Sequence, residues 1–260
     1  MITESLIELS KQFPAFDRAI QGGLITFARL LCFVYFAPIF NRKEIPSITK
    51  LSFAMLLTIV AISLMGDIAT PKAENTMINI LLNAVFGGIV GFVANTIFCA
   101  INAGGDMINM QMGLSSAMMF DSSTKSQSSV FGTFLALFGA VLFLHIGGMF
   151  WLMKAIMRSF EVFPIYSTSL PLSQIISINY VIEITANVLF VGLQIASPIL
   201  LATLGQDIIL GIISKTAPQV NVFQLSFLFK PVMGAAIMIM ILPMLVNVVT
   251  DYFLSYAQIY

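Results

Sequence analysis

Residues 77–101 read MINILLNAVFGGIVGFVANTIFCAI, and they contain no aspartate, glutamate, lysine or arginine. An α-helix that crosses the hydrocarbon core of a bilayer needs about 20 predominantly apolar residues. This stretch is long enough and apolar enough to form such a helix. Its Gly87 and Gly91 form a G-x-x-x-G pattern, supported by Gly88, and small residues at this spacing let two helices approach closely. The pattern therefore predicts tight helix packing.

The composition of the whole chain supports a membrane location. Of 260 residues, 58% are hydrophobic and 9% are charged, whereas soluble domains carry roughly 25% charged residues. So few charges cannot cover a surface that faces water, and we expect an integral membrane protein. The formal net charge is zero, with 12 basic and 12 acidic residues. Because there is no basic excess, we expect no nucleic-acid partner.

The reactive side chains of the sequence argue against catalysis and metal binding. His145 is the single histidine, and Cys32 and Cys99 each lie within an apolar run. We expect two buried free thiols without a disulfide framework, and no metal site with several histidine ligands. The sequence has no P-loop, nucleophile elbow or paired catalytic carboxylates. We therefore expect neither an enzyme nor a bound cofactor.

Apolar runs along the chain predict an all-α integral membrane protein with about six hydrophobic helical segments, in a single domain over residues 1–260. The runs are residues 19–41, 51–66, 77–101, 126–153, 175–204 and 231–250, with a mixed stretch at 205–230. They lack the ten-residue alternation of a β-barrel. Loop lysines and arginines are nearly balanced between the two sides, so the positive-inside rule assigns no orientation. Either the bias is weak, or some runs pack against protein instead of lipid.

Two charges inside apolar runs are candidates for function. Arg29 lies within the first run, where a charge is costly and is usually paired or functional. It makes a structural ion pair, caps the carbonyls of a neighbouring helix, or takes part in transport. Glu183 belongs to a polar stripe at helical spacing, which also includes Asn179, Asn187, Gln194 and Ser197. That stripe must face protein or water, so it joins helices, lines a pore or relays protons.

Residues 104–129 read GGDMINMQMGLSSAMMFDSSTKSQSS, which is too polar for lipid and too poor in charge for an ordinary solvated loop. Methionines re-pack easily, and glycines free the backbone. Irregular backbone at membrane depth is tolerated only when it is buried in protein or lines a cavity. The stretch is therefore either a plug that blocks a conduit, or a methionine-rich helical turn that packs. The candidate plug residues are Gly104, Gly105, Met107, Met110, Gln111, Met112, Gly113, Met118 and Met119.

Three stretches together resemble the FliR family, the R-type export-gate subunits of flagellar and type III secretion systems. The first two are ARLLCFVYFAPIFNRKEIPSITK at residues 28–50 and AGGDMINMQMGLSSAMMFD at residues 103–121. The third and most specific is PILLATLGQDIILGIISKTAPQVNVFQLSFLFK at residues 198–230. The chain departs from the family where Ser122 replaces a frequent proline and Met149 replaces a frequent histidine.

The resemblance implies an architecture and a set of partners. Packed hairpins of this chain would join P-type and Q-type subunits, as one R-type copy, in a helical gate, with the large export-gate and switch subunits nearby. The assembly would pass unfolded export substrates across the bacterial cytoplasmic membrane at the flagellar basal body. A plug at about residues 104–122 would close it. The opening helix and the PQVNVF segment favour the flagellar branch over the injectisome branch.

The resemblance also implies subunit-contact or structural roles for a second group of residues, with a tight turn near Pro218. These residues are Arg29, Pro38, Glu183, Asp207, Pro218, Gln219, Asn221, Phe223 and Lys230. Two alternatives remain. One is a small-solute or proton-coupled transporter that uses Arg29 and Glu183, and the other is a purely structural membrane assembly factor.

Overall fold

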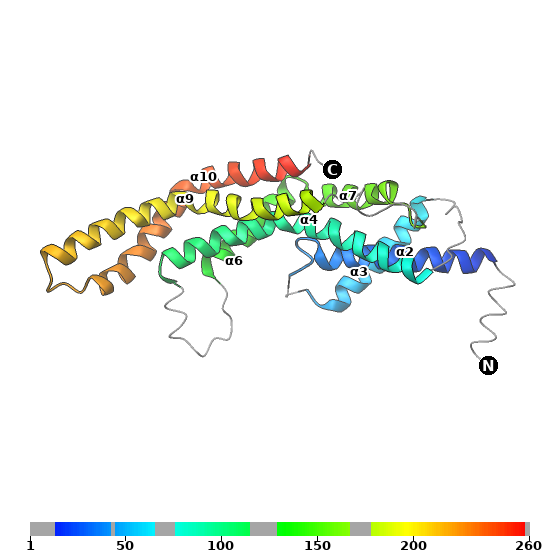
Figure 1. Cartoon of the computed structure of the whole chain (residues 1–260), viewed down its shortest axis with the longest axis horizontal. Coiled ribbons are helices and arrows are strands. Elements are labelled where there is room, and N and C mark those ends of the chain that lie inside the picture. Colours follow the sequence, from blue (N-terminus) through cyan, green and yellow to red (C-terminus); the bar gives the residue numbers. More distant parts are fainter. Residues whose placement is uncertain (1–13, 43–44, 66–75, 115–128, 167–177, 258–260) are drawn as a thin grey trace. The chain divides into compact units, whose positions relative to one another are not determined.

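The structure, a computed structural model, describes residues 14–42, 45–65, 76–114, 129–166 and 178–257, and these ranges contain helices and turns but no strand (Figure 1). The all-α fold predicted from the apolar runs is therefore confirmed. The helices are α2 Pro14–Phe36, α3 Ser47–Met65, α4 Thr76–Gln111, α6 Val130–His145, α7 Gly148–Val162, α9 Ile178–Thr216 and α10 Val222–Ala257.

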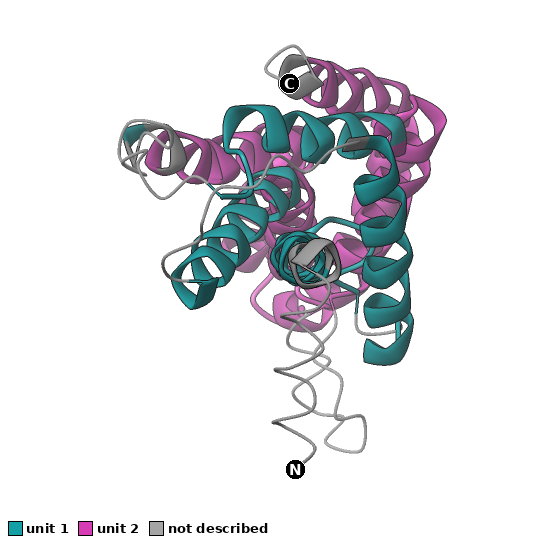
Figure 2. Cartoon of the chain, turned by 90° about the vertical axis from the view of Figure 1, so that its right-hand side faces the viewer, with its two compact units in different colours: residues 1–95, 150–181, 260 teal, residues 96–149, 182–259 magenta. Residues whose placement is uncertain are grey.

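Contacts within the chain divide it into two compact units, which Figure 2 shows in different colours. Unit 1 comprises residues 1–95, 150–181 and 260, and unit 2 comprises residues 96–149 and 182–259. Unit 1 thus contains α2, α3, the first part of α4 and most of α7. Unit 2 contains the last part of α4, α6, α10 and nearly all of α9. That residues 1–260 act as one export-gate domain stays a prediction.

The close packing predicted from the glycines of α4 is confirmed in unit 1. A Cβ atom on Gly87 would overlap the carbonyl oxygen of Arg29, and one on Gly91 would lie 2.7 Å from that of Phe33. Because backbone atoms cannot move aside, only glycine lets α2 and α4 come this close. At the end of α2, Ile39 has a φ of 71°, a strained conformation for a β-branched residue.

Unit 2 packs around aromatic rings and a second set of close glycines. The ring centroids of Phe98 and Phe143 lie 5.4 Å apart, and those of Phe143 and Phe253 lie 5.2 Å apart. A Cβ atom on Gly105 would lie 2.5 Å from the Cα atom of Gly132. In the same unit, α9 and α10 form a hairpin joined by a short turn (Figure 1).

Several predicted segment boundaries were wrong. The mixed stretch at 205–230 is mostly helical, because it supplies the end of α9 and the start of α10. Conversely, the run at 126–153 is not one helix. It breaks between α6 and α7 at Gly147, whose φ of 76° is a conformation that glycine adopts without strain.

Among the described residues, four helices are long and apolar enough to cross a membrane, and α6 with α7 qualifies as a pair. Three of them greatly exceed a bilayer: α4 and α10 have 36 residues each and α9 has 39. A helix of this length spans about 54 Å or more, whereas the hydrocarbon core is about 30 Å thick. Even a tilt of about 40° leaves such a helix longer than the core.

Candidate functional site

Arg29 lies at the centre of a buried polar cluster in unit 1. Its side chain on α2 is fully buried, and its Nε atom donates to Oδ1 of Asn83 at 2.9 Å. Nη1 donates to the carbonyl oxygen of Ser159 at 2.9 Å, and Nη2 donates to that of Phe163 at 2.6 Å. Nη2 also donates to Oδ1 of Asn83. All of these acceptors are neutral oxygens.

Aromatic rings surround the same guanidinium group. Its central carbon lies 4.3 Å from the ring centroid of Phe160, 5.3 Å from that of Phe86 and 5.5 Å from that of Phe163. The faces of aromatic rings attract a cation, and this attraction strengthens when the cation is removed from water. Arginine suits the position because its planar fork of donors reaches several fixed acceptors at once.

The arginine closes the C-terminal end of α7. The last carbonyls of a helix have no partner within it, and a cation is favourable at that negative end. Of the roles considered for Arg29, the carbonyl cap is confirmed. The acceptors described here are neutral, so they do not form an ion pair with it. Asn83 completes the cluster, because its Nδ2 atom donates to the carbonyl oxygens of Asn79 at 2.8 Å and Ile165 at 3.1 Å.

Sequence reasoning missed Asn83. The available signal was a pair of amides four residues apart, Asn79 and Asn83, in an otherwise apolar run. Both side chains are fully buried. A buried amide in an apolar helix needs a partner, so the pair pointed to a polar contact on that face.

The first part of the predicted plug is the end of a helix in unit 2. Gly104 and Gly105 lie inside α4 and are buried, so the expectation that they free the backbone was wrong. A Cβ atom on Gly104 would lie 2.9 Å from the carbonyl oxygen of Gly192 on α9, while Gly105 faces Gly132 on α6. These glycines are therefore packing positions, as in the methionine-rich helical alternative.

Met112 fastens the end of α4 to α10. Its side chain is fully buried, and a Cβ atom on Gly234 would overlap its Sδ and Cε atoms. Gly113 follows with a φ of 75°, and a Cβ atom on it would lie 3.8 Å from Cε1 of Phe227. We call Met112, Gly113, Phe227 and Gly234 the α4 anchor.

The other candidate plug residues are placed differently. Met110 is 72% exposed, whereas Met107 and Gln111 are half-buried. Met118 and Met119 lie outside the described residues. The anchor thus holds the chain immediately before the remaining part of the predicted plug.

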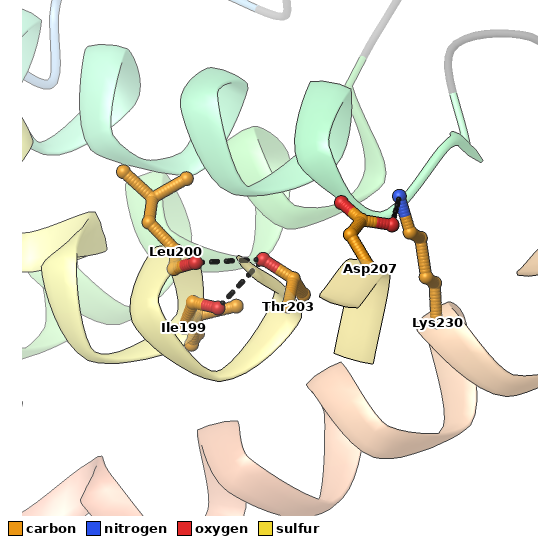
Figure 3. A network of polar contacts seen from close by, with 5 residues as sticks. All are labelled: Ile199, Leu200, Thr203, Asp207 and Lys230. Atoms are coloured by element: carbon orange, nitrogen blue, oxygen red, sulfur yellow. Dashed lines mark hydrogen bonds and ion pairs between the residues drawn. The ribbon is translucent and has the colours of Figure 1, made fainter. Parts of the chain in front are cut away.

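Asp207 and Lys230 join α9 to α10 (Figure 3). Lys230 Nζ lies 2.6 Å from Oδ1 of Asp207, and these side chains are 17% and 39% exposed, respectively. One turn before Asp207, the buried hydroxyl of Thr203 donates to the carbonyl oxygens of Ile199 and Leu200. The pair therefore neutralises two charges that sequence reasoning had placed in a mixed stretch.

The tight turn predicted around Pro218 is confirmed. The amide of Val220 donates to the carbonyl oxygen of Ala217 at 3.0 Å. Oδ1 of Asn221 accepts from the amide of Gln224 at 3.2 Å, which makes Asn221 the N-cap of α10. Pro218 and Gln219 are exposed, and Phe223 is 73% exposed.

The polar stripe of α9 faces outward from unit 2. Glu183, Asn187 and Gln194 are exposed, and the hydroxyl of half-buried Ser197 donates to the carbonyl oxygen of Gln194. Asn179, four residues before Glu183, is also exposed, in the part of α9 that belongs to unit 1. An outward polar stripe on an apolar helix needs water or another protein beside it.

The remaining candidate residues do not form a binding site among the described residues. Pro38 is buried after the end of α2. Cys32 is half-buried and Cys99 is exposed, and neither forms a disulfide, so the expected burial was wrong for Cys99. Within the described ranges, no three histidine, cysteine, aspartate or glutamate side chains form a group that could hold a metal ion.

The apolar helices and their buried polar contacts define a multi-pass integral membrane protein. Residues 20–256 match the family described as bacterial export proteins, family 1. The chain belongs to this family.

Named relatives agree with this assignment. The chain is 25% identical to the flagellar biosynthetic protein FliR of Aquifex aeolicus, over 91% of each chain. It is 26% identical to FliR of Bacillus subtilis, over 96% of this chain and 93% of the relative. It is 27% identical to the surface presentation of antigens protein SpaR of Shigella flexneri, over 80% of each chain.

The predicted resemblance to the FliR family is thereby confirmed. The chain is a subunit of a flagellar or type III export apparatus. Its long apolar helices fit a multi-pass protein of the bacterial inner membrane.

Proposed function

We propose that this chain is the R-type subunit of the flagellar export gate. With P-type and Q-type subunits, and as a single copy, it forms the channel for unfolded export substrates. The large export-gate and switch subunits of the apparatus lie nearby. Residues 104–122 contribute a plug that seals this channel. The FliR names of several relatives support the flagellar branch.

The length of α4 is the observation that carries the proposal of a multi-subunit gate. Its 36 residues contain no proline and no lysine or arginine, and Asp106 is its one acidic residue. Lipid covers only about 30 Å of such a helix. The rest of its apolar surface needs a protein cover, which α2, α6, α9 and α10 of the same chain supply in part and which neighbouring subunits complete.

Exposed side chains of unit 2 support contacts with other subunits. The side chains of Glu183 and Asn187 can hydrogen-bond to polar groups of another subunit, and such bonds are strongest where water is excluded. At the other end of the hairpin, Phe223 exposes 73% of its surface next to the tight turn. Large exposed aromatic side chains are typical anchors of protein interfaces. We assign these residues, with Pro218, Gln219 and Asn221, to subunit contacts.

The α4 anchor supports the plug. A segment that seals a conduit needs one fixed end, and buried Met112 in the space beside Gly234 provides one. Met110 is exposed just before the anchor, and methionine adapts to irregular surfaces. The plug would therefore be fixed at one end by the α4 anchor and would seal the channel with deformable side chains.

The transporter alternative loses support from Arg29. Its donors are engaged by oxygens of its own chain and its side chain is fully buried, so it has a structural role. The two alternatives also differ for Glu183→Gln, which retains hydrogen bonding without the charge. A proton-coupled transporter would lose activity, whereas an export gate keeps most of its secretion.

Deletion of residues 115–121 tests the plug. The deletion spares α4, because Ile108 and Met112 are fully buried and their loss would disturb the core. The variant is co-expressed with the partner subunits, and ion leakage and secretion are measured alongside assembly. We expect an assembled complex that leaks ions. A matched variant in which a Gly/Ser sequence of equal length replaces 115–121 separates loss of the seal from a shortened connection.

The opposite result is equally informative. An assembled deletion complex that keeps the membrane tight would show that these residues do not seal the channel. A deletion chain that fails to assemble, while the Gly/Ser variant assembles and stays tight, would lead to the same conclusion.

A further inference from the structure

Prolines lie inside both helices of the α9–α10 hairpin in unit 2. A proline has no amide hydrogen, so the carbonyl oxygen four residues before it loses its helical donor. At Pro198 in α9 that carbonyl belongs to Gln194, and the hydroxyl of Ser197 donates to it at 3.0 Å. The residue before Pro231 in α10 is Lys230, whose amino group contacts a carboxylate on α9 instead. The serine thus replaces the missing donor in α9, whereas α10 keeps a weak point at Pro231.

Opposite Pro231, α9 has a glycine that its packing does not require. The two helices are antiparallel (Figure 1), and the ion pair places Asp207 at the level of Lys230. Gly205 therefore lies at the level of Val232. A Cβ atom on Gly205 would meet open space, although glycine weakens a helix relative to alanine. Both helices of the hairpin are thus weakened at one level, and in Figure 1 the orange start of α10 and its red end run in different directions.

The end of α4 contacts α10 on both sides of Pro231. The ring of Phe227 lies about one turn before the proline, and a Cβ atom on Gly113 would lie 3.8 Å from it. Gly234 follows the proline by almost one turn, and a Cβ atom there would overlap the buried side chain of Met112. Because Phe227 and Gly234 are separated by about two turns, they share one helix face. The α4 anchor therefore spans the weak point of α10.

A bend at Pro231 changes the distance between the two places on α10 that α4 contacts. The end of α4 cannot stretch to follow them, because it is helical up to Gln111 and the amide of Met112 still donates to the carbonyl oxygen of Ile108 at 3.0 Å. Met112 therefore fits beside Gly234 at one bend angle and is displaced at another.

We propose that the α9–α10 hairpin has a hinge at Pro231 and Gly205, and that its bend angle decides whether Met112 occupies the α4 anchor. A partner that binds the hairpin beyond the hinge, where Phe223 is exposed, then moves the end of α4 without touching it. Coupling between distant sites requires such an element with two arrangements that both sites bias. The proposal concerns contacts within unit 2 alone, so it does not depend on whether residues 104–122 seal a channel.

Hydrogen–deuterium exchange of the Met112 and Gly113 amides tests the hinge. Both amides donate to carbonyl oxygens at the end of α4, so they exchange when this end opens. The full chain is reconstituted into lipid nanodiscs and compared with Gly205→Ala, which stiffens α9 at the hinge. We expect the two amides to exchange about fivefold more slowly in this variant, the factor that corresponds to the helix preference of alanine over glycine.

Gly211→Ala is the matched control for this variant. A Cβ atom on Gly211 would also meet open space, so the two substitutions strengthen α9 to the same extent. Gly211 lies nearer the end of α9 than the hinge, and its replacement should leave the exchange of Met112 and Gly113 unchanged.

Pro231→Ala tests the other half of the hinge, since it restores the amide hydrogen that the carbonyl oxygen of Phe227 lacks. We expect slower exchange of Met112 and Gly113 in this variant as well. Pro243→Ala is its control, because Pro243 lies in the same helix but about three turns further along. The control should not slow the exchange of these amides.

Two results would overturn the proposal. If Gly205→Ala and Gly211→Ala slowed the exchange of Met112 equally, the cause would be general stabilisation of α9. If Gly205→Ala or Pro231→Ala left this exchange unchanged, the end of α4 would open independently of that half of the hinge.

Discussion

Arg29 in unit 1 and Lys230 in unit 2 both place a cation within a predominantly apolar helix, but the two units accommodate the charge differently. Arg29 is fully buried and is bound by neutral oxygens and aromatic rings. Lys230 retains partial exposure and meets a carboxylate on the neighbouring helix. The first arrangement depends on the positions of several acceptors at once, whereas the second depends mainly on opposite charge. Loss of the cation should therefore affect unit 1 far more.

Removal of Arg29 should have the largest effect. In Arg29→Ala, Oδ1 of Asn83 and the carbonyl oxygen of Phe163 lose the donor that Arg29 supplies, while the carbonyl oxygen of Ser159 keeps the amide of Phe163. Each buried group left unsatisfied costs about 1–3 kcal/mol. Arg29→Lys should also fail, because an ammonium group cannot replace the planar fork. We expect loss of folded protein in detergent, measured as the monodisperse fraction and its thermal unfolding. If the loss were no greater than that in Lys215→Ala, which removes an exposed cation, the contrast between the two units would not hold.

Replacement of the close glycine beside Arg29 should have the next largest effect. Gly87→Ala places a methyl group against the carbonyl of Arg29, and such overpacking costs typically about 1–3 kcal/mol. Gly205→Ala on α9 is the control, because its new methyl group meets open space and alanine favours a helix by up to about 1 kcal/mol. Thermal unfolding should shift down for the first variant and up for the second. Equal shifts would show that the space beside Gly87 does not matter.

A smaller effect is expected at the α4 anchor, because the obstructing atoms belong to the end of a flexible side chain. Gly234→Ala should destabilise by about 1 kcal/mol in the presence of Met112. In a Met112→Ala background, the same change should be nearly neutral, since the obstructing atoms are gone. A double-mutant cycle on thermal unfolding measures this coupling. Additive effects would show that Gly234 and Met112 are not coupled, and would contradict the α4 anchor.

The ion pair of unit 2 should give the smallest effect. Lys230→Gln should destabilise by about 0.2–1 kcal/mol, as expected for a partly exposed pair. The difference should shrink at high salt, because ions screen such pairs. Unfolding at low and high ionic strength checks both points, with Asp207→Asn as the matched partner variant. If Lys230→Gln destabilised the protein as much as Arg29→Ala, the two units would not differ in how strongly they depend on their cations.

The sequence was most informative where one physical requirement allowed few solutions. A buried Arg29 had to find acceptors, and Gly87 with Gly91 had to meet another helix, so both predictions were confirmed. The membrane location followed from the scarcity of charge, and the all-α fold followed from the apolar runs. These inferences needed no knowledge of which distant residues supply the partners.

Elsewhere, the local pattern permitted two structures and distant contacts chose between them. Gly104 and Gly105 suit a hinge as well as a tight crossing, and Gly192 and Gly132 select the crossing. From sequence alone, a charged residue such as Asp207 is as compatible with a loop as with a helix. Its ion pair with Lys230 explains how it is accommodated in an apolar helix. The break at Gly147 depends on a backbone conformation that glycine permits but does not require.

The contacts of Arg29 also fix an order of events during synthesis. Its carbonyl acceptors follow it by 130 and 134 residues, a separation that takes a ribosome roughly 7–27 seconds to cover. Throughout this interval the nascent chain carries an arginine whose carbonyl acceptors do not yet exist, although Asn83 follows it by only 54 residues, and the first residues of unit 2 are made before unit 1 is complete. A chain released before Ser159 would keep its first apolar helix but leave that cation without its carbonyl acceptors.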